Sequence, residues 1–160
     1  QRIMHLGAPA TFTFASLRRA GYETAMLASG LQPHSLECIA EVEPSYQTAL
    51  KILSMPDRPT ALLCATDRMA YGVIKASYEL GIRVPDDLSV IGHDNVPSIM
   101  NDGPTALTTM ELPLEDAGSR LATMLLTCIK SPEIKPVHNI LPVRFIDRGS
   151  TAPPFIPSVC

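Results

Sequence analysis

Arg18, Asp67 and the Asp94–Asn95 pair are the side chains of this sequence best suited to chemistry, and that chemistry is binding. A carboxylate can accept hydrogen bonds from two hydroxyl groups at once, and a guanidinium donates through a planar fork. No obvious nucleophile accompanies them. The combination favours a ligand that carries several hydroxyl groups, and it predicts that the protein is not an enzyme.

Each of these side chains also has an explanation that involves no ligand. Asp67 could cap the start of a helix, Asp94 could form a turn, and Arg18 could be a solvated charge on a helix surface. Asp67 and Asp94 could also act as the paired carboxylates of a glycosidase, although single carboxylates at helix starts are common. On the residues alone, these alternatives remain open.

The segments that would position these residues alternate between strands and helices. Periodicity predicts strands at 2–6, 37–42, 60–65 and 88–92 and helices at 13–29, 44–55 and 67–80. The strand at 60–65 carries an unbroken apolar run, which is typical of a strand covered on both faces. Short turns between the segments indicate an α/β fold with a doubly wound parallel sheet. In the first helix, the residues at helical spacing are Phe14, Leu17, Gly21, Ala25 and Ala28.

A doubly wound sheet binds ligands outside the carboxyl ends of its strands. In this sequence the residues after those ends are 7–13, Thr66 with Asp67, and 93–95. Arg18 would lie near the start of the helix that follows the first strand. We therefore expect these groups to converge on one rim of the sheet, which is the predicted ligand site.

After His93 the alternation stops. Residues 93–104 contain two prolines and a glycine and predict a loop, whereas 106–111 and 137–146 are expected to be extended. Pro113 opens a helix that runs to Lys130. The tail at 151–160 is rich in proline and is expected to be flexible. The expected buried face of the last helix comprises Leu114, Ala117, Leu121, Leu125 and Cys128.

Composition excludes several classes of protein. The chain has 160 residues, of which 46% are hydrophobic and 18% charged, and its net charge of −3 disfavours direct binding of nucleic acid. Its apolar runs are far shorter than the roughly 20 residues that cross a bilayer, so no membrane contact is expected. Because the four cysteines and four histidines are scattered and no phosphate-binding glycine loop occurs, we expect neither a metal nor a cofactor.

Residues 59–96, PTALLCATDRMAYGVIKASYELGIRVPDDLSVIGHDNV, resemble the most recognisable stretch of the lactose-repressor/galactose-repressor family. Residues 17–26 (LRRAGYETAM), 104–118 (PTALTTMELPLEDAG) and 140–154 (ILPVRFIDRGSTAPP) are similar to further family segments. The resemblance covers nearly the whole chain in the right order. It implies the effector-sensing part of a bacterial transcriptional regulator.

The resemblance implies a fold of two lobes around a cleft, of the periplasmic-binding-protein type I, with a small DNA-binding headpiece at the N-terminus. Residues 1–107 and 137–150 would form the C-terminal lobe, and 108–136 would belong to the N-terminal lobe. Most of that second lobe and the headpiece would be absent from this chain, which begins at Gln1 inside a strand-like segment.

The resemblance also assigns ligand contacts. Thr66 stands where many sugar-responsive members have Asn, and it is shorter. Leu112 stands where some members have a Gln that touches the ligand, and His93 replaces an aromatic residue. A stacking aromatic often lies near residues 42–45, and none is nearer here than Tyr46. The implied ligand-binding residues are Arg18, Thr66, Asp67 and Asp94, with His93, Asn95 and Leu112 as further candidate contacts.

The partners implied by the resemblance are a small-molecule effector and a second copy of the chain. The effector would be a mono- or disaccharide rather than a purine, and operator DNA would be contacted only through the headpiece. The homodimer would use the helix that carries Tyr71, Lys75 and Tyr78, together with loop 97–103. Such a protein acts in the cytoplasm by shifting between lobe angles. The alternative on the same fold is a sugar-binding protein of a transport system.

Overall fold

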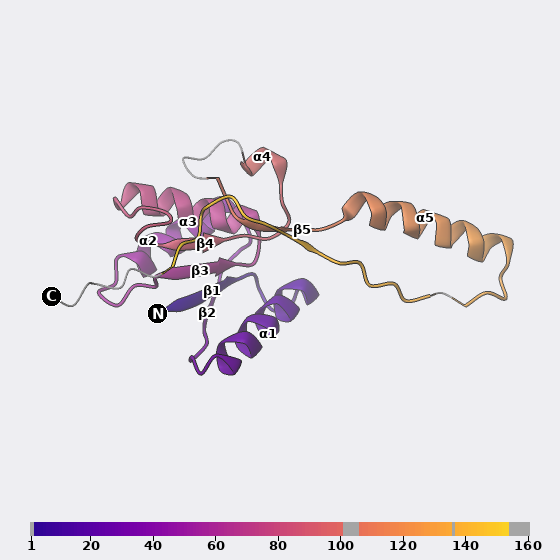
Figure 1. Cartoon of the computed structure of the whole chain (residues 1–160), viewed down its shortest axis with the longest axis horizontal. Helices are drawn as coiled ribbons and strands as arrows, with labels where there is room; N and C mark the ends of the chain where they lie inside the picture. Colours follow the sequence, from indigo (N-terminus) through magenta and orange to yellow (C-terminus); the bar gives the residue numbers. More distant parts are fainter. Residues whose placement is uncertain (1, 101–105, 136, 154–160) are drawn as a thin grey trace.

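A four-stranded parallel sheet forms the centre of the structure, a computed structural model that describes residues 2–100, 106–135 and 137–153 (Figure 1). Leu6 lies opposite Leu36 on one neighbouring strand and Cys64 on the other. This arrangement confirms the predicted doubly wound α/β sheet. The strands are β1 (Ile3–Gly7), β2 (His34–Glu37), β3 (Ala61–Cys64) and β4 (Ser89–Ile91), in the order β2-β1-β3-β4.

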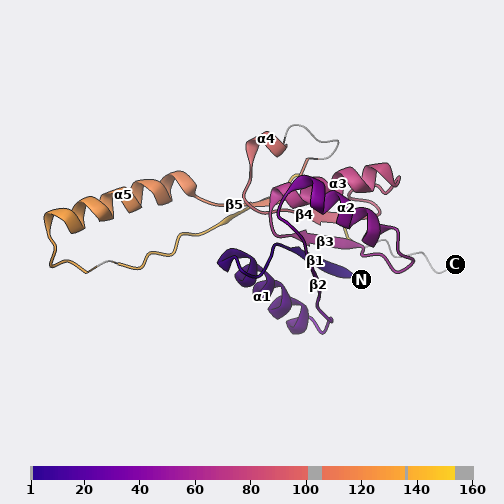
Figure 2. The ribbon, with the colours of Figure 1, turned by 180° about the vertical axis from the view of Figure 1, so that it is seen from behind.

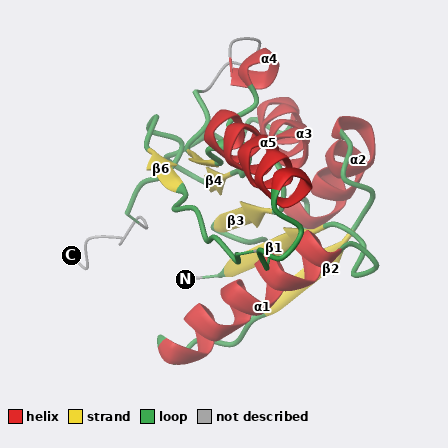
Figure 3. Ribbon diagram, turned by 90° about the vertical axis from the view of Figure 1, so that its right-hand side faces the viewer, coloured by secondary structure: helices red, strands yellow, loops and turns green. Residues whose placement is uncertain are grey.

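Helices cover the two faces of this sheet unequally. Figure 3 shows α1 (Thr13–Ala28) on one face and the pair α2 (Val42–Leu53) and α3 (Asp67–Glu79) on the other. The main core lies between the sheet and the α2–α3 pair, because the fully buried side chains alternate along the strands toward that side. Its largest fully buried members are Leu6, Leu62, Met69, Leu88, Val73 and Val90.

A glycine allows α2 and α3 to pack closely. A Cβ atom on Gly72 of α3 would lie 2.5 Å from the carbonyl oxygen of Val42 and 2.8 Å from the backbone nitrogen of Tyr46. Any larger residue at this position would therefore push the two helices apart. The close packing fixes where α3 begins, and α3 begins at the predicted ligand rim.

The α1 face differs from the sequence expectation. The buried residues of α1 are Ala15, Tyr22 and Met26. They are not the residues at helical spacing noted in the sequence, which are Phe14, Leu17, Gly21, Ala25 and Ala28. Tyr22 decides this orientation, because its ring stacks on His5 of β1 at 5.4 Å and its hydroxyl donates to the carbonyl oxygen of Ile3 at 2.9 Å. On β3, positions 62 and 64 are buried whereas 61 and 63 are half-buried, so full cover on both faces was wrong.

The second part of the chain leaves the sheet and returns to it. After the short α4 (Pro97–Met100), β5 (Thr109–Glu111) pairs antiparallel with β6 (Arg144–Ile146). Between these two strands, α5 (Leu114–Lys130) projects away from the rest of the molecule, and none of its residues is buried (Figures 1 and 2). The expected buried face of this helix is therefore uncovered in this chain.

Two expected boundaries need correction. The second strand was expected at 37–42 but lies at His34–Glu37, and by Val42 the chain is already in α2. The cause is that β2 is the edge strand of the sheet, so most of its side chains face water and carry no apolar pattern. In the 137–146 segment only Arg144–Ile146 forms a strand. Most of the tail at 151–160 lies outside the described residues.

Candidate functional site

Arg18 and Asp94 meet at the carboxyl ends of the strands, as the sequence predicts. The Nη1 atom of Arg18 donates to the carbonyl oxygen of Ala65, just beyond β3, at 2.5 Å. Its Nη2 atom donates to Oδ1 of Asp94, just beyond β4, at 3.0 Å. Arg18 is carried by α1, the helix that follows β1. Its guanidinium therefore connects this helix to the chain beyond β3 and to the chain beyond β4. About a fifth of the Arg18 side chain and 27% of the Asp94 side chain stay exposed, so both can reach a ligand.

The backbone at Asp94 and Asn95 is bent to present these side chains. Both residues have positive φ angles, 113° and 54°, in a region that side-chain-bearing residues seldom adopt. The N–H of Asp94 donates to the carbonyl oxygen of Met110 at 2.9 Å, which holds the bend in place. Nδ1 of His93 lies 3.0 Å from Oδ1 of Asp94. His93 and Arg18 therefore both hold the same carboxylate oxygen of Asp94.

Asp67 lies beneath the rim rather than on it. Its side chain is fully buried, and its two carboxylate oxygens accept hydrogen bonds from the N–H of Val96 at 2.8 Å and from Oγ1 of Thr109 at 2.6 Å. The helix cap is Thr66, whose Oγ1 accepts from the N–H of Met69 at 3.3 Å. In this structure Asp67 braces the segments that carry Asp94, while the half-buried Thr66 stays at the surface of the rim.

Glu111 and Arg148 extend the site, and sequence reasoning missed both. Asn95 donates through Nδ2 to Oε1 of Glu111 at 2.7 Å and accepts at Oδ1 from Nη2 of Arg148 at 2.6 Å. Arg144 donates to Oε2 of Glu111 at 2.8 Å, and this bond, with a smaller contribution from Asn95, holds the pKa of the Glu111 carboxyl below its usual value. No spacing in the sequence marks these residues, because the β5–β6 pairing brings them together.

Two phenylalanines at the start of α1 also border Arg18. The Cζ atom of Arg18 lies 5.0 Å from the centre of the Phe14 ring, within range of a cation–π interaction. The Phe12 ring stacks on Phe14 with 5.7 Å between centroids. Both rings are exposed, Phe12 by 52% and Phe14 by 38%. The rim therefore combines an ion pair with an aromatic surface.

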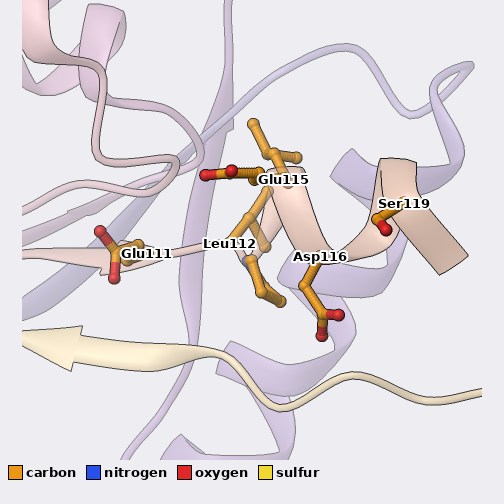
Figure 4. A pocket seen from close by; sticks show the side chains of 7 residues that line it. Glu111, Leu112, Glu115, Asp116 and Ser119 are labelled. Carbon is orange, nitrogen blue, oxygen red and sulfur yellow. The ribbon is translucent and has the colours of Figure 1, made fainter.

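Leu112 lines an open pocket of about 600 Å³ at the start of α5 (Figure 4). The pocket is acidic, because three carboxylates line it. Glu111 belongs both to this pocket and to the Asn95 contacts, and so connects the two places. The lining residues are Glu111, Leu112, Pro113, Leu114, Glu115, Asp116 and Ser119.

The residues expected at a dimer interface lie on α3. Tyr78 is 75% exposed, Tyr71 is half-buried, and Lys75 places its Nζ atom 4.6 Å from the centre of the Tyr46 ring. The hydroxyl of Tyr46 donates to Glu79. Most of the expected 97–103 loop lies outside the described residues.

Within residues 2–100, 106–135 and 137–153, no cluster of three or more His, Cys, Asp or Glu side chains could hold a metal ion. No helix in the same residues combines the length and the apolar character needed to cross a bilayer.

Comparison with known proteins places this geometry in a family. A model of the periplasmic binding protein-like domain matches residues 1–151. The chain is 38% identical over 138 residues to the HTH-type transcriptional repressor PurR of Escherichia coli, covering 84% of this chain and 40% of the repressor. It therefore spans about two fifths of the length of these curated relatives.

Solved structures agree with this assignment. The lac repressor dimer bound to operator and the anti-inducer ONPF superposes with a TM-score of 0.86 at 30% identity, over 94% of this chain and 52% of that one. A LacI family transcriptional regulator from Enterococcus faecium with bound ribose gives a TM-score of 0.84 at 29% identity, over 96% and 57%. The chain belongs to the periplasmic-binding-protein-like family and is a fragment of an effector-binding domain of the lactose-repressor/galactose-repressor family.

Proposed function

We propose that this chain is the sugar-sensing lobe of a DNA-binding transcriptional regulator of the cytoplasm. The observation that carries the proposal is the Arg18–Asp94 ion pair at the carboxyl rim, held by Ala65 on one side and His93 on the other. A fixed carboxylate beside a fixed guanidinium matches neighbouring hydroxyl groups of a sugar, one accepting and one donating. The relative with bound ribose supports a sugar as the effector class.

The proposed mechanism is a shift between two lobe angles. Arg18 and Asp94 would bind one side of the effector, and a second lobe would close on the other side. The β5 and β6 strands would connect the lobes, because β5 leads from the rim to α5 and β6 leads from α5 back toward the sheet. Asn95, next to Asp94, bonds Glu111 of β5, so a ligand contact at Asp94 adjoins the crossing strands.

Residues 108–136 would belong to that second lobe. The support is the exposed apolar face of α5, on which Leu121 is 66% and Leu125 62% exposed. Such a face normally packs against another element, since apolar surface left in water is unfavourable. Homodimerisation through Tyr71, Lys75 and Tyr78 of α3 is part of the same proposal, and operator DNA would be contacted by a headpiece elsewhere in the intact protein.

Calorimetric titration of the intact protein with D-ribose, D-glucose, D-galactose and hypoxanthine tests the proposed function. We expect one of the sugars to bind. Arg18→Ala or Asp94→Asn should lower the affinity for that sugar roughly 10- to 100-fold, because each substitution removes a charge-assisted hydrogen bond. Arg19→Ala is the matched control, because Arg19 is the next residue and pairs with Glu23 and Glu37 instead. Unchanged affinity in the Arg18 and Asp94 variants contradicts the proposal.

A further inference from the structure

Phe12 and Phe14 form an exposed aromatic surface. The two rings stack on each other, and each keeps more than a third of its surface in water. Phe12 precedes the first residue of α1, so the pair lies at the carboxyl end of β1, on the same rim as Arg18. Exposed aromatic pairs are costly in water, and they are common where a ligand or partner covers them.

Arg18 fixes this pair in relation to the polar groups of the site. Its guanidinium lies over Phe14 while donating to Ala65 and Asp94. The guanidinium of Arg18 therefore covers one face of the Phe14 ring. The more exposed Phe12 ring extends the aromatic surface beside the ion pair.

Tyr46 does not supply the aromatic group expected near residues 42–45. Its hydroxyl donates to Glu79, the last residue of α3, and Lys75 lies over its ring. Because α3 begins at the rim with Asp67, Glu79 lies about 18 Å further along the helix axis. The Tyr46 side chain is therefore occupied at a distance from Arg18.

We infer that Phe12 and Phe14 form the stacking wall of the effector site and receive the C–H face of a sugar ring. This inference rests on the proposed function, because it takes the Arg18–Asp94 pair as the polar half of the same site. A sugar ring has an apolar C–H face and a polar hydroxyl edge, and the rim offers an aromatic surface beside a carboxylate and a guanidinium. The hydrogen bonds from Arg18 and His93 to the Asp94 side chain both end on Oδ1, so the inference assigns Oδ2 as the acceptor for a ligand hydroxyl.

The test compares phenylalanine variants of the intact protein, using the sugar that binds the wild type in the calorimetric panel. Phe12→Ala and Phe14→Ala are each expected to lower the affinity for that sugar about tenfold. Phe12→Tyr is expected to keep wild-type affinity, because it keeps the ring. Leu27→Ala is the matched control, because Leu27 is a similarly exposed apolar residue near the other end of α1. Saturation-transfer NMR is expected to give the largest signals on the C–H protons of one ring face.

The outcomes separate this inference from the proposed function. If Arg18→Ala lowers the affinity for the sugar while both phenylalanine variants bind it like the wild type, the inference of a stacking wall is wrong and the proposed function stands. If no sugar in the panel binds the wild type, the proposed sugar response fails, and the inference fails with it. Binding of hypoxanthine alone, weakened by Phe12→Ala, overturns the sugar ring as the occupant of the wall.

Discussion

Oγ1 of Thr109 donates a 2.6 Å hydrogen bond to Oδ1 of Asp67, and both side chains are fully buried. The bond joins the first residue of α3 to the first residue of β5, two residues far apart in the sequence. The other oxygen of Asp67 holds the N–H of Val96. A single carboxylate thus ties together the helix start, the loop after Asp94 and the strand that leaves the sheet.

Asp67→Asn is expected to lower the free energy of unfolding by roughly 2–3 kcal/mol, because the amide must present a donor where the carboxylate accepts two hydrogen bonds in a buried place. Urea unfolding followed by circular dichroism measures the change. The exposed neighbour Arg68 serves as control, with Arg68→Ala expected within about 0.5 kcal/mol of wild type. Equal stability of the Asp67 and Arg68 variants would show that Asp67 is no brace.

Gly92→Ala is expected to destabilise the chain by about 1–3 kcal/mol through crowding. A Cβ there would lie 2.3 Å from Oδ1 of Asp67 and 2.9 Å from Cδ2 of Leu107, both in the packed interior. Gly118→Ala on α5 is the opposite case, because nothing lies within 4 Å of its Cβ position. It should raise stability by up to about 1 kcal/mol through helix propensity. Thermal unfolding of the two variants side by side checks both signs.

His5 makes stability depend on pH. Burial lowers the pKa of His5, and Arg19 adds to the effect while Glu23 and Glu37 oppose it. Its ring nitrogens have no hydrogen-bond partner among the described residues. Because the unfolded state then binds the proton more readily, stability should fall as pH drops below about 6.5, by at most ~1.4 kcal/mol per pH unit.

The variant His5→Phe tests this pH dependence, since it keeps a ring against Tyr22 but cannot take up a proton. Urea midpoints measured between pH 7.5 and pH 5 should vary less in His5→Phe than in the wild type. The exposed His138→Gln variant should keep the wild-type slope. A wild-type slope retained in His5→Phe would assign the proton uptake to another group.

The apolar face of α5 should behave differently in the isolated chain and in the intact protein. In the isolated chain, Leu121→Ser with Leu125→Ser should barely alter unfolding, because both residues are mostly exposed, and should reduce self-association in sedimentation velocity. In the intact protein the same pair should cost several kcal/mol if a second lobe covers the face. Equal effects in both settings would contradict that lobe contact.

The proposed dimer surface has its own test. Tyr78→Asp places a charge on the most exposed aromatic residue of α3, and we expect it to convert the intact protein from dimer to monomer in sedimentation equilibrium. Tyr22→Phe keeps a buried ring on the opposite face of the sheet and should leave the dimer intact. An unchanged dimer in the Tyr78 variant would place the interface elsewhere.

The sequence predicted those parts of the fold whose signals are local. The apolar run of β3, the Thr66 cap and the glycine after α3 are close in sequence, so the carboxyl rim and Arg18 opposite Asp94 could be placed in advance. The edge strand β2 could not, because exposed strand residues show no apolar alternation. Phe14 was grouped with the apolar spacing of α1, but the Tyr22–His5 stack shows that another face of the helix meets the sheet, and Phe14 lies against Arg18 instead.

The contacts around Asn95 could not be predicted from the sequence, for a different reason. Glu111, Arg144 and Arg148 lie 16 to 53 residues from Asn95 in the sequence, and the pairing of β5 with β6 brings their segments together. No periodicity records such pairing. The burial of Asp67 is similar, because its partners Val96 and Thr109 belong to later segments.

The antiparallel pairing of Glu111 with Arg144 also makes the α5 segment an insertion with touching ends. Residues 112–143 leave and re-enter at one point, while Ser150 anchors the returning chain through its Oγ, which donates to the carbonyl oxygen of Val90 at 2.6 Å. Replacing the insertion by a short hairpin turn would shorten the loop to be closed without breaking the sheet. The contacts that hold Arg18 and Asp94 come from Ala65, His93 and Met110, which lie outside this insertion, so the rim should keep its geometry when the insertion is removed.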